Sequence, residues 1–185
     1  MVEGKVTLEN LSFLLSRLGI KNPGIIVPPL IGSDATAFDF DMAKQVALDY
    51  YGLQEECYMV WKSDPITFPA PDLSKYSIIV NLNDLTCFGA IPYGILVTLL
   101  LPTHFNQSDL QNFQNSLHET ALDYNISILG GHSEFTSAVI RPVIDLSMIG
   151  FVPKTFLPTR NLAAGDHVYL LGYVGNEGTA ILGEK

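Results

Sequence analysis

The sequence predicts a domain that combines helices with strands. Residues 93–101 are almost entirely apolar, which is typical of a strand that is covered on both faces. Residues 108–124 carry apolar side chains at helical spacing behind a Ser-x-x-Gln start of the capping-box form. In residues 140–148 the even positions are all apolar, which indicates a strand with one solvated face. Together these segments predict strands packed by helices.

Other patterns predict the remaining elements. Four leucines at helical spacing predict a helix over residues 8–18, with Gly19 as its C-cap. A second helix over residues 41–51 is expected to begin at Asp41 and to end before Gly52. Further expected elements are strands at 57–61, 76–81 and 126–129, a proline-rich loop at 66–72 and a short helix at 84–89.

Composition and charge exclude several functional classes. Apolar residues make up 48% of the 185, so the chain is expected to fold around a core rather than stay disordered. The formal net charge is −9 and the few basic residues do not cluster, which argues against nucleic-acid binding. An acidic protein that binds an anion usually needs a metal between the two.

The sequence also predicts a soluble, cytoplasmic protein. Cys57 and Cys87 form neither a disulfide framework nor a zinc-binding spacing. The N-terminus lacks the layout of a signal peptide. The longest apolar run, residues 95–101, is far shorter than the roughly 20 residues that a membrane helix needs. We therefore expect no membrane association.

The domain organisation is expected to change near residue 153. Residues 1–153 are predicted to form one domain. Residues 153–165 look like a linker, followed by a strand at 167–171, a Gly-spaced turn and a helix start at 179–182. One strand and one helix cannot bury their own apolar faces. Residues 154–185 are therefore predicted to be a linker and the truncated start of a second domain.

Three acidic segments suggest a site for a hard cation. Asp34, Asp64 and Asp84 each stand in a predicted turn beside a strand-like run, and Glu134 follows a fourth run. Carboxylate oxygens gathered at strand ends can hold a cation, and the cation can in turn hold a polyphosphate. Local alternatives remain open, because Asp34 and Asp64 are common turn residues and Asp84 would also serve as a helix N-cap.

A glycine pair provides a candidate phosphate site. Gly130 and Gly131 allow close approach of the backbone, whose N–H groups can bind a phosphate oxygen. Ser133 is a candidate oxygen donor, whereas His132 is a poor ligand for a hard ion. Arg141 could meet a phosphate or could pair with Asp145. The glycine pair could equally be an ordinary turn at a strand end, and the Gly172, Gly175, Gly178 spacing is only a weak nucleotide-loop signal.

The order and spacing of these segments resemble the aminoimidazole ribonucleotide (AIR) synthase superfamily of ATP-dependent enzymes. The resemblance is to its AIR synthase-related, hydrogenase-maturation-like branch, whose members include a carbamoyl dehydratase, and specifically to the N-terminal domain. The segments that carry the resemblance are Lys62–Phe68, Asn81–Asp84 with Gly89-Ala90, Thr98–Pro102, Gly130–Thr136 with Arg141-Pro142, and Glu177–Leu182. Ser33 departs from the family, which often has an acidic residue there.

The resemblance implies a fold, two ligands and a set of residues. The fold would be the PurM-like α+β domain, a mixed sheet packed by helices that pairs into a β-barrel across a homodimer. ATP and magnesium would lie in a groove that uses residues of both chains. Magnesium would be held by Asp34, Asp64, Asp84 and Glu134, and the nucleotide by Asn83, Gly130, Gly131, Ser133 and Arg141.

Two functional classes follow from this resemblance. The first is the ATP- and magnesium-binding domain of an enzyme that activates or transfers a phosphoryl group to an unknown small-molecule or protein acceptor. It includes enzymes similar to thiamine-monophosphate kinase or selenophosphate synthetase. The second is a non-catalytic dimerisation or regulatory module that keeps the fold. In either case, we expect the 185-residue chain alone to be inactive.

Overall fold

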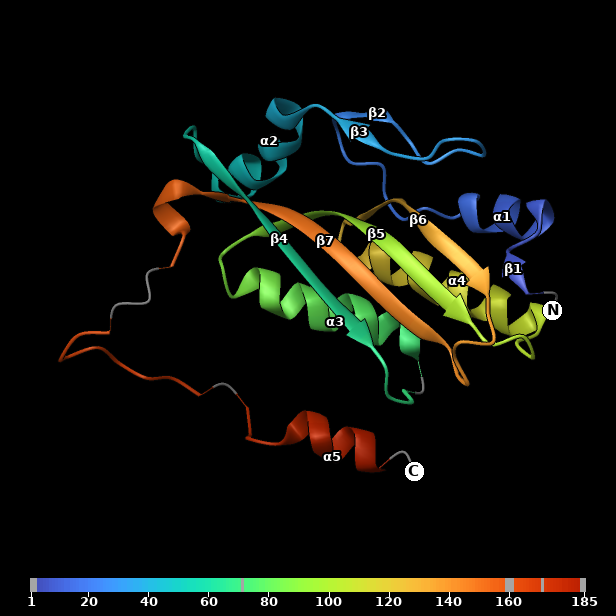
Figure 1. The fold of residues 1–185 in the computed structure, drawn as a ribbon. Coiled ribbons are helices and arrows are strands. Elements are labelled where there is room, and N and C mark those ends of the chain that lie inside the picture. The colour runs from blue at the N-terminus through green and yellow to red at the C-terminus, as the bar shows by residue number, and fades with distance from the viewer. Residues whose placement is uncertain (1–2, 71, 159–161, 171, 184–185) are drawn as a thin grey trace.

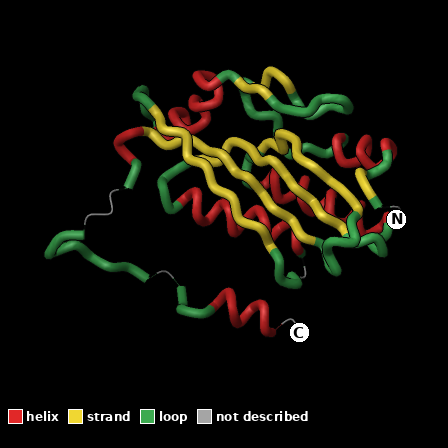
Figure 2. Tube along the Cα trace, viewed as in Figure 1, coloured by secondary structure: helices red, strands yellow, loops and turns green. Residues whose placement is uncertain are grey.

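A five-stranded mixed sheet forms the centre of the computed structural model, which describes residues 3–70, 72–158, 162–170 and 172–183. The strand order is β1-β6-β5-β7-β4, and β5 and β6 run parallel while every other neighbouring pair runs antiparallel (Figure 1). Figure 2 shows the sheet strands in yellow, side by side, with helices in red on either side. The strands are β1 (Gly4–Lys5), β4 (Cys57–Ile66), β5 (Ile91–Leu101), β6 (Ser127–Phe135) and β7 (Val143–Pro153). A separate hairpin pairs β2 (Ile25–Val27) with β3 (Ala37–Phe38).

Helices cover the two sheet faces unequally (Figure 1). The helices α3 (Leu73–Thr86) and α4 (Gln107–Asp123) pack on one face and enclose the main hydrophobic core. On the other face, α2 (Phe40–Tyr51) and the β2–β3 hairpin cover only one end, around Tyr93 and Phe151. The helix α1 (Leu8–Leu15) lies near β1 and β6 (Figure 1). The α+β fold with a mixed sheet is therefore confirmed.

The helix α3 replaces two predicted elements, the strand at 76–81 and the short helix at 84–89. The β-branched run Ile78-Ile79-Val80 favours a strand locally. Tertiary packing outweighs that preference, because the buried positions recur at helical spacing. These buried positions are Ser74, Ser77, Ile78, Asn81, Leu82 and Leu85. Asp72 caps the helix by accepting a hydrogen bond from the Lys75 N–H, so the interpretation of Asp84 as an N-cap was wrong.

The strand β6 continues through the glycine pair, which we predicted to be a turn. The register against β5 shifts between Ile95 and Leu96, so Leu129 forms a β-bulge. Gly130 and Gly131 adopt φ angles of 141° and 146°, which side chains rarely tolerate. A Cβ on Gly131 would lie 1.8 Å from the main-chain oxygen of Val97. Close approach of two strands, rather than a turn, therefore explains this glycine.

The strand β4 is longer than the predicted segment 57–61. It runs to Ile66, so Lys62, Ser63 and Asp64 lie within a strand and not in a turn. Pro65 is compatible with this position because β4 is an edge strand of the sheet. Regular alternation along β4 fixes the side of the sheet on which each of these residues lies.

Several predicted helix ends were wrong by a few residues. The helix α1 ends at Leu15, and Gly19 instead forms an isolated bridge with Ser127. The N-cap of α2 is Asp39 rather than Asp41, whereas Gly52 ends the helix in the left-handed conformation as predicted. The N-cap of α4 is Asn106, which precedes the predicted capping box. At the N-termini of α2 and α4, a neighbouring polar residue of similar capping ability takes the position.

The chain beyond β7 contains a 3-10 turn at Lys154–Phe156 and the helix α5 (Asn176–Gly183), which includes the predicted helix start. Residues 167–170 form no strand, and Leu171 of the predicted segment 167–171 lies outside the described residues. A strand needs a partner, and none lies beside this segment among the described residues. The assignment of 154–185 to a second domain stays a prediction. No described helix is both long and apolar enough to cross a membrane.

Candidate functional site

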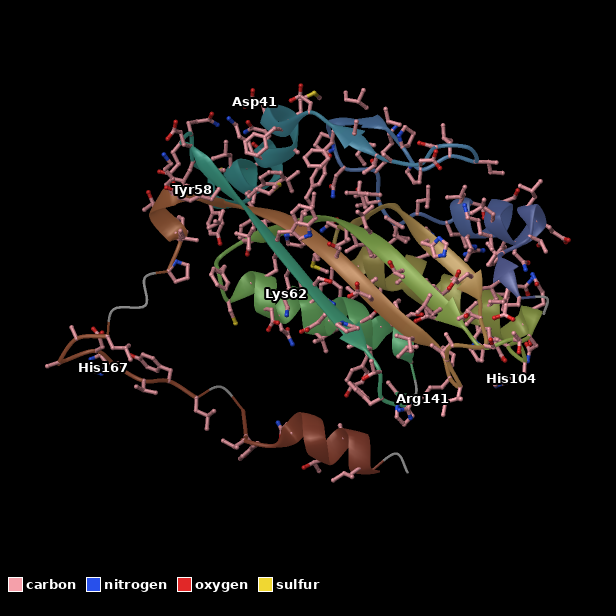
Figure 3. The ribbon with its side chains drawn as sticks, viewed as in Figure 1. Asp41, Tyr58, Lys62, His104, Arg141 and His167 are labelled. Atoms are coloured by element: carbon pink, nitrogen blue, oxygen red, sulfur yellow. The ribbon has the colours of Figure 1, made fainter. Side chains whose placement is uncertain are left out.

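Asp64 and Asp84 face each other across the junction of β4 and α3. The Lys62 ammonium bridges them, with Nζ 2.7 Å from Asp64 Oδ2 and 3.0 Å from Asp84 Oδ2. Figure 3 shows Lys62 on β4 where that strand passes over α3. Lys62 and Asp64 are two positions apart on β4, so they project from the same face. Two of the four predicted metal ligands are thus brought together.

The electrostatics of this cluster favour a bound positive charge. Hydrogen bonds to the carboxylates of Asp64 and then Asp84 raise the pKa of Lys62 above its usual value. The side chains stay partly exposed, with accessible fractions of 27% for Lys62, 42% for Asp64 and 51% for Asp84. A ligand from solvent can therefore reach the carboxylates.

A buried amide lies beside the same cluster. Asn81 stands one helical turn before Asp84 on α3 and is fully buried. Its Nδ2 donates hydrogen bonds to the main-chain oxygens of Asp64 and Ser77, at 3.3 and 2.9 Å. Its Oδ1 has no hydrogen-bond partner among the described residues. An unpaired buried acceptor is uncommon and costly, so Asn81 Oδ1 would be stabilised by a donor or a cation.

Four other predicted residues line a single cavity of about 580 Å³ near α1 and β6. Asp34 reaches it from the β2–β3 loop, and Gly130, Gly131 and Ser133 reach it from β6. His132 also lies on its rim. The inner wall is apolar and consists mainly of leucines of α1 with Val97, Leu99, Phe113, Leu117 and Ile128. The predicted phosphate-binding segment thus borders a cavity of the size of a small-molecule site.

The two groups of residues are well separated within one chain. In the sheet order, β6 and β4 are three strand spacings apart, which is about 14 Å. Glu134 also lies on the opposite face of the sheet from Asp64, because it pairs with Leu100 rather than with a core position of β5. Among the described residues, no group of three or more His, Cys, Asp or Glu side chains could hold a metal. A single chain therefore does not unite all four predicted ligands.

The remaining predicted residues lie apart from both groups. Asn83 is exposed on α3, and Arg141 is exposed in the loop between β6 and β7 (Figure 3). Asp145 accepts a hydrogen bond from Ser63 Oγ at 2.9 Å, and no described ion pair joins it to Arg141. His132 Nε2 lies 3.2 Å from Glu134 Oε2. His132 itself lies within the strand β6.

The uncovered part of the sheet carries both apolar and polar side chains. Its β5 positions Leu96, Thr98 and Leu100 alternate with the core positions, and Leu96 is exposed. On β4, Trp61 is exposed and its Nε1 donates a hydrogen bond to Ser147 Oγ at 2.5 Å. Val97, by contrast, lies in the core under the helices. We call the face that contains Trp61, Leu96, Thr98, Leu100 and Ser147 the open face.

Sequence reasoning selected Asp64 and Asp84 but missed Lys62 and Asn81. A signal for both was present in their spacing. Lys62 lies two residues before Asp64, which places it on the same strand face, and Asn81 lies three residues before Asp84, which places it on the same helix face. The first spacing becomes informative once β4 is seen to continue to Ile66, and the second once residues 73–86 are recognised as a helix.

Residues 32–152 match the family model of the AIR synthase related protein, N-terminal domain. The chain is 30% identical over 119 residues to a protein of Methanocaldococcus jannaschii that is provisionally named a hydrogenase expression/formation protein, covering 64% of this chain and 36% of that relative. It is 26% identical over 111 residues to the thiamine-monophosphate kinase of Bacillus subtilis, covering 60% and 34%. The chain thus spans about a third of the length of these two relatives.

Solved structures share the fold. The E. coli hydrogenase maturation protein HypE superposes with a TM-score of 0.63 at 22% identity, over 86% of this chain and 48% of HypE. A HypE in complex with ATP superposes with a TM-score of 0.52 at 22% identity, over 71% of this chain and 37% of that protein. At this level of identity the similarity establishes a common fold.

Proposed function

Because the chain belongs to the AIR synthase related family through its N-terminal domain, we propose that it binds ATP together with magnesium and provides the nucleotide-binding part of an enzyme that activates or transfers a phosphoryl group. The observation that carries this proposal is the pair of facing carboxylates, Asp64 on β4 and Asp84 on α3, that share one bound cation, the Lys62 ammonium. Names of relatives add support, since one is a kinase and a protein of this fold forms a complex with ATP.

The donor set at Asp64 and Asp84 fits magnesium. Magnesium prefers oxygen ligands, and proteins often supply one or two carboxylates while phosphates and waters complete the shell. Two carboxylates with a buried amide oxygen nearby match that pattern better than a site for zinc or copper would. Bound there, magnesium would neutralise charge on the phosphates. The residues of this chain would hold the ion and orient the nucleotide.

The phosphate-binding role belongs to the β6 segment in this proposal. Gly130, Gly131 and Ser133 line the cavity, where the glycine backbone and the Ser133 hydroxyl would meet the phosphates. This segment lies about 14 Å from the carboxylate pair of its own chain, too far for one nucleotide phosphate chain to meet both closely. A second copy of the chain would supply the missing half. We therefore propose a homodimer with composite sites.

Titration calorimetry of the purified chain with ATP, in magnesium and in excess chelator, tests the proposal. We expect binding only with magnesium, because carboxylates and phosphates repel when no metal lies between them. Equal affinity in both conditions, or binding in neither, contradicts the proposal. Dimerisation without nucleotide binding would instead support a non-catalytic module.

A further inference from the structure

We propose that Lys62 is a built-in competitor for the divalent cation, so that the Asp64–Asp84 pair accepts a metal ion only together with a polyphosphate that takes over the displaced ammonium. Only the part of this inference that concerns the polyphosphate rests on the proposed function. The competition between Lys62 and the metal ion stands on the geometry of the chain itself.

The Lys62 ammonium and a metal ion would use the same carboxylate oxygens. Lys62 Nζ contacts Oδ2 of Asp64 and Oδ2 of Asp84 at 2.7 and 3.0 Å. A divalent cation between these carboxylates would lie within a few ångströms of the ammonium, where like charges repel. Metal binding therefore requires Lys62 to leave. The side chain is partly exposed and flexible, so departure does not disturb the core.

A buried amide that contacts the Asp64 main chain has an unsatisfied acceptor. Asn81 Oδ1 is buried and remains unpaired among the described residues, while Nδ2 of the same amide donates a hydrogen bond to the main-chain oxygen of Asp64. Its amide nitrogen is fixed by two main-chain oxygens, so the amide cannot turn to satisfy the oxygen. A metal ion, or a water bound to it, would supply the missing partner. Asn81 is thus a positioning residue of the same site.

Once displaced, the Lys62 ammonium would have lost both of its carboxylate partners. A metal ion bound to two carboxylates and accompanied by a free ammonium leaves a local excess of positive charge. A polyphosphate removes that excess, because its oxygens complete the metal shell and pair with the ammonium. Metal and polyphosphate are therefore coupled, and each raises the affinity of the other by the same factor. Lys62 would keep the site closed to free divalent ions.

The test uses Mn²⁺ as the probe, with binding followed by the loss of the paramagnetic resonance signal of free Mn²⁺. The full chain is compared with Lys62→Met, Lys62→Arg and Lys44→Met, with and without ADP. Lys44→Met is the matched control, because Lys44 forms a similar ion pair with Asp41 on α2, away from this site. Thermal melts confirm that each variant is folded.

Without ADP, we expect Lys62→Met to bind Mn²⁺ about tenfold more tightly than the unmodified chain, the combined effect of two partly exposed ion pairs. Lys62→Arg and Lys44→Met should retain the weak Mn²⁺ binding of the unmodified chain. ADP should tighten Mn²⁺ binding to the unmodified chain and should do so much less in Lys62→Met.

Equal or weaker Mn²⁺ binding by folded Lys62→Met in the absence of ADP would overturn the inference. If ADP binds to no variant while Lys62→Met still gains Mn²⁺ affinity, the competition is supported and the proposed nucleotide function fails.

Discussion

At the scale of single residues, two aspartates of α3 and its N-cap are expected to have different roles: Asp84 in ligand binding and Asp72 in stability. Asp84 points to β4 and pairs with Lys62, whereas Asp72 caps α3 and accepts a hydrogen bond from the Ser116 hydroxyl, which lies 2.7 and 2.6 Å from its two carboxylate oxygens. We expect Asp84→Asn to weaken binding of magnesium–ADP at least about tenfold, with a loss in unfolding free energy below about 1 kcal/mol, since the ion pair is exposed. Calorimetry and urea unfolding measure the two effects.

The matched variant Asp72→Ala should behave in the opposite way. Loss of the cap and of the Ser116 hydrogen bond should lower the free energy of unfolding by about 1–2 kcal/mol and leave the affinity for magnesium–ADP unchanged. If Asp84→Asn loses stability and keeps its affinity, the carboxylate is structural and the proposed site is wrong.

A second residue-level prediction concerns pH. Burial, with a smaller contribution from the Asp39 charge, raises the pKa of Tyr93 from 10.0 to about 12. The folded state then holds this proton more tightly than the unfolded state, so stability is complete below pH 10 and falls as the pH rises from 10 towards 12. Urea unfolding across that range should show the fall.

The control is Tyr93→Phe. It removes the hydrogen bond from the hydroxyl to the Pro23 oxygen, so it should cost about 1 kcal/mol at neutral pH. It should also reduce the alkaline loss of stability relative to the unmodified chain. An identical alkaline slope in both proteins would show that other groups cause it.

The sequence pointed to those site residues whose chemistry alone suggests a function. It did not point to those whose function depends on contacts made only in the folded chain. Asp64 and Asp84 could be proposed because carboxylates are the usual ligands of a hard cation. Lys62 could not, because its role depends on a strand and a helix that meet only in the folded chain. Asn81 was hidden for the same reason, since its segment has the local composition of a strand.

At the scale of elements, β6 provides a sharp test. Gly131→Ala would place a Cβ against the main-chain oxygen of Val97, whereas a Cβ on Gly130 would come no closer than 3.7 Å to Leu96. We expect Gly131→Ala to destabilise the protein by more than about 3 kcal/mol and Gly130→Ala by about 1–2 kcal/mol, the latter from its φ angle alone. Equal losses would contradict the close approach of β5 and β6.

The elements that sequence patterns predicted best are those with strong periodicity. The strand β5, the helix α4 and the alternating part of β7 were placed within a few residues, because their apolar patterns match a strand or helix facing the core. The helix α3 was missed because its packing against the sheet outweighs the strand propensity of its β-branched residues. The continuous β6 was missed because its pairing with β5 accommodates the glycine pair within the strand.

At the scale of the whole molecule, the open face predicts association. Leu96 and Trp61 are exposed on a sheet face that neither α3 nor α4 covers. We expect the chain to be a dimer at micromolar concentration and Leu96→Asp to be a monomer that remains folded. Light scattering coupled to gel filtration measures both. Leu122→Asp, at an exposed position of α4, is the matched control and should stay dimeric.

Activity is expected to require more than this chain. The chain spans about a third of the length of the two relatives, and phosphoryl transfer needs the acceptor held in line with the phosphate. We therefore predict magnesium-dependent nucleotide binding without turnover at a useful rate. Robust ATP hydrolysis that Asp64→Asn abolishes would show instead that this chain carries a complete catalytic site.

The central claim is that Asp64 and Asp84 hold the metal that carries the nucleotide. Anomalous diffraction from crystals grown with Mn²⁺ and ADP locates the metal directly. We predict an anomalous peak between the carboxylates of Asp64 and Asp84, with the Lys62 ammonium displaced and a phosphate in contact with the metal. A peak elsewhere, or ADP bound with Lys62 still bridging the two carboxylates, would contradict the claim.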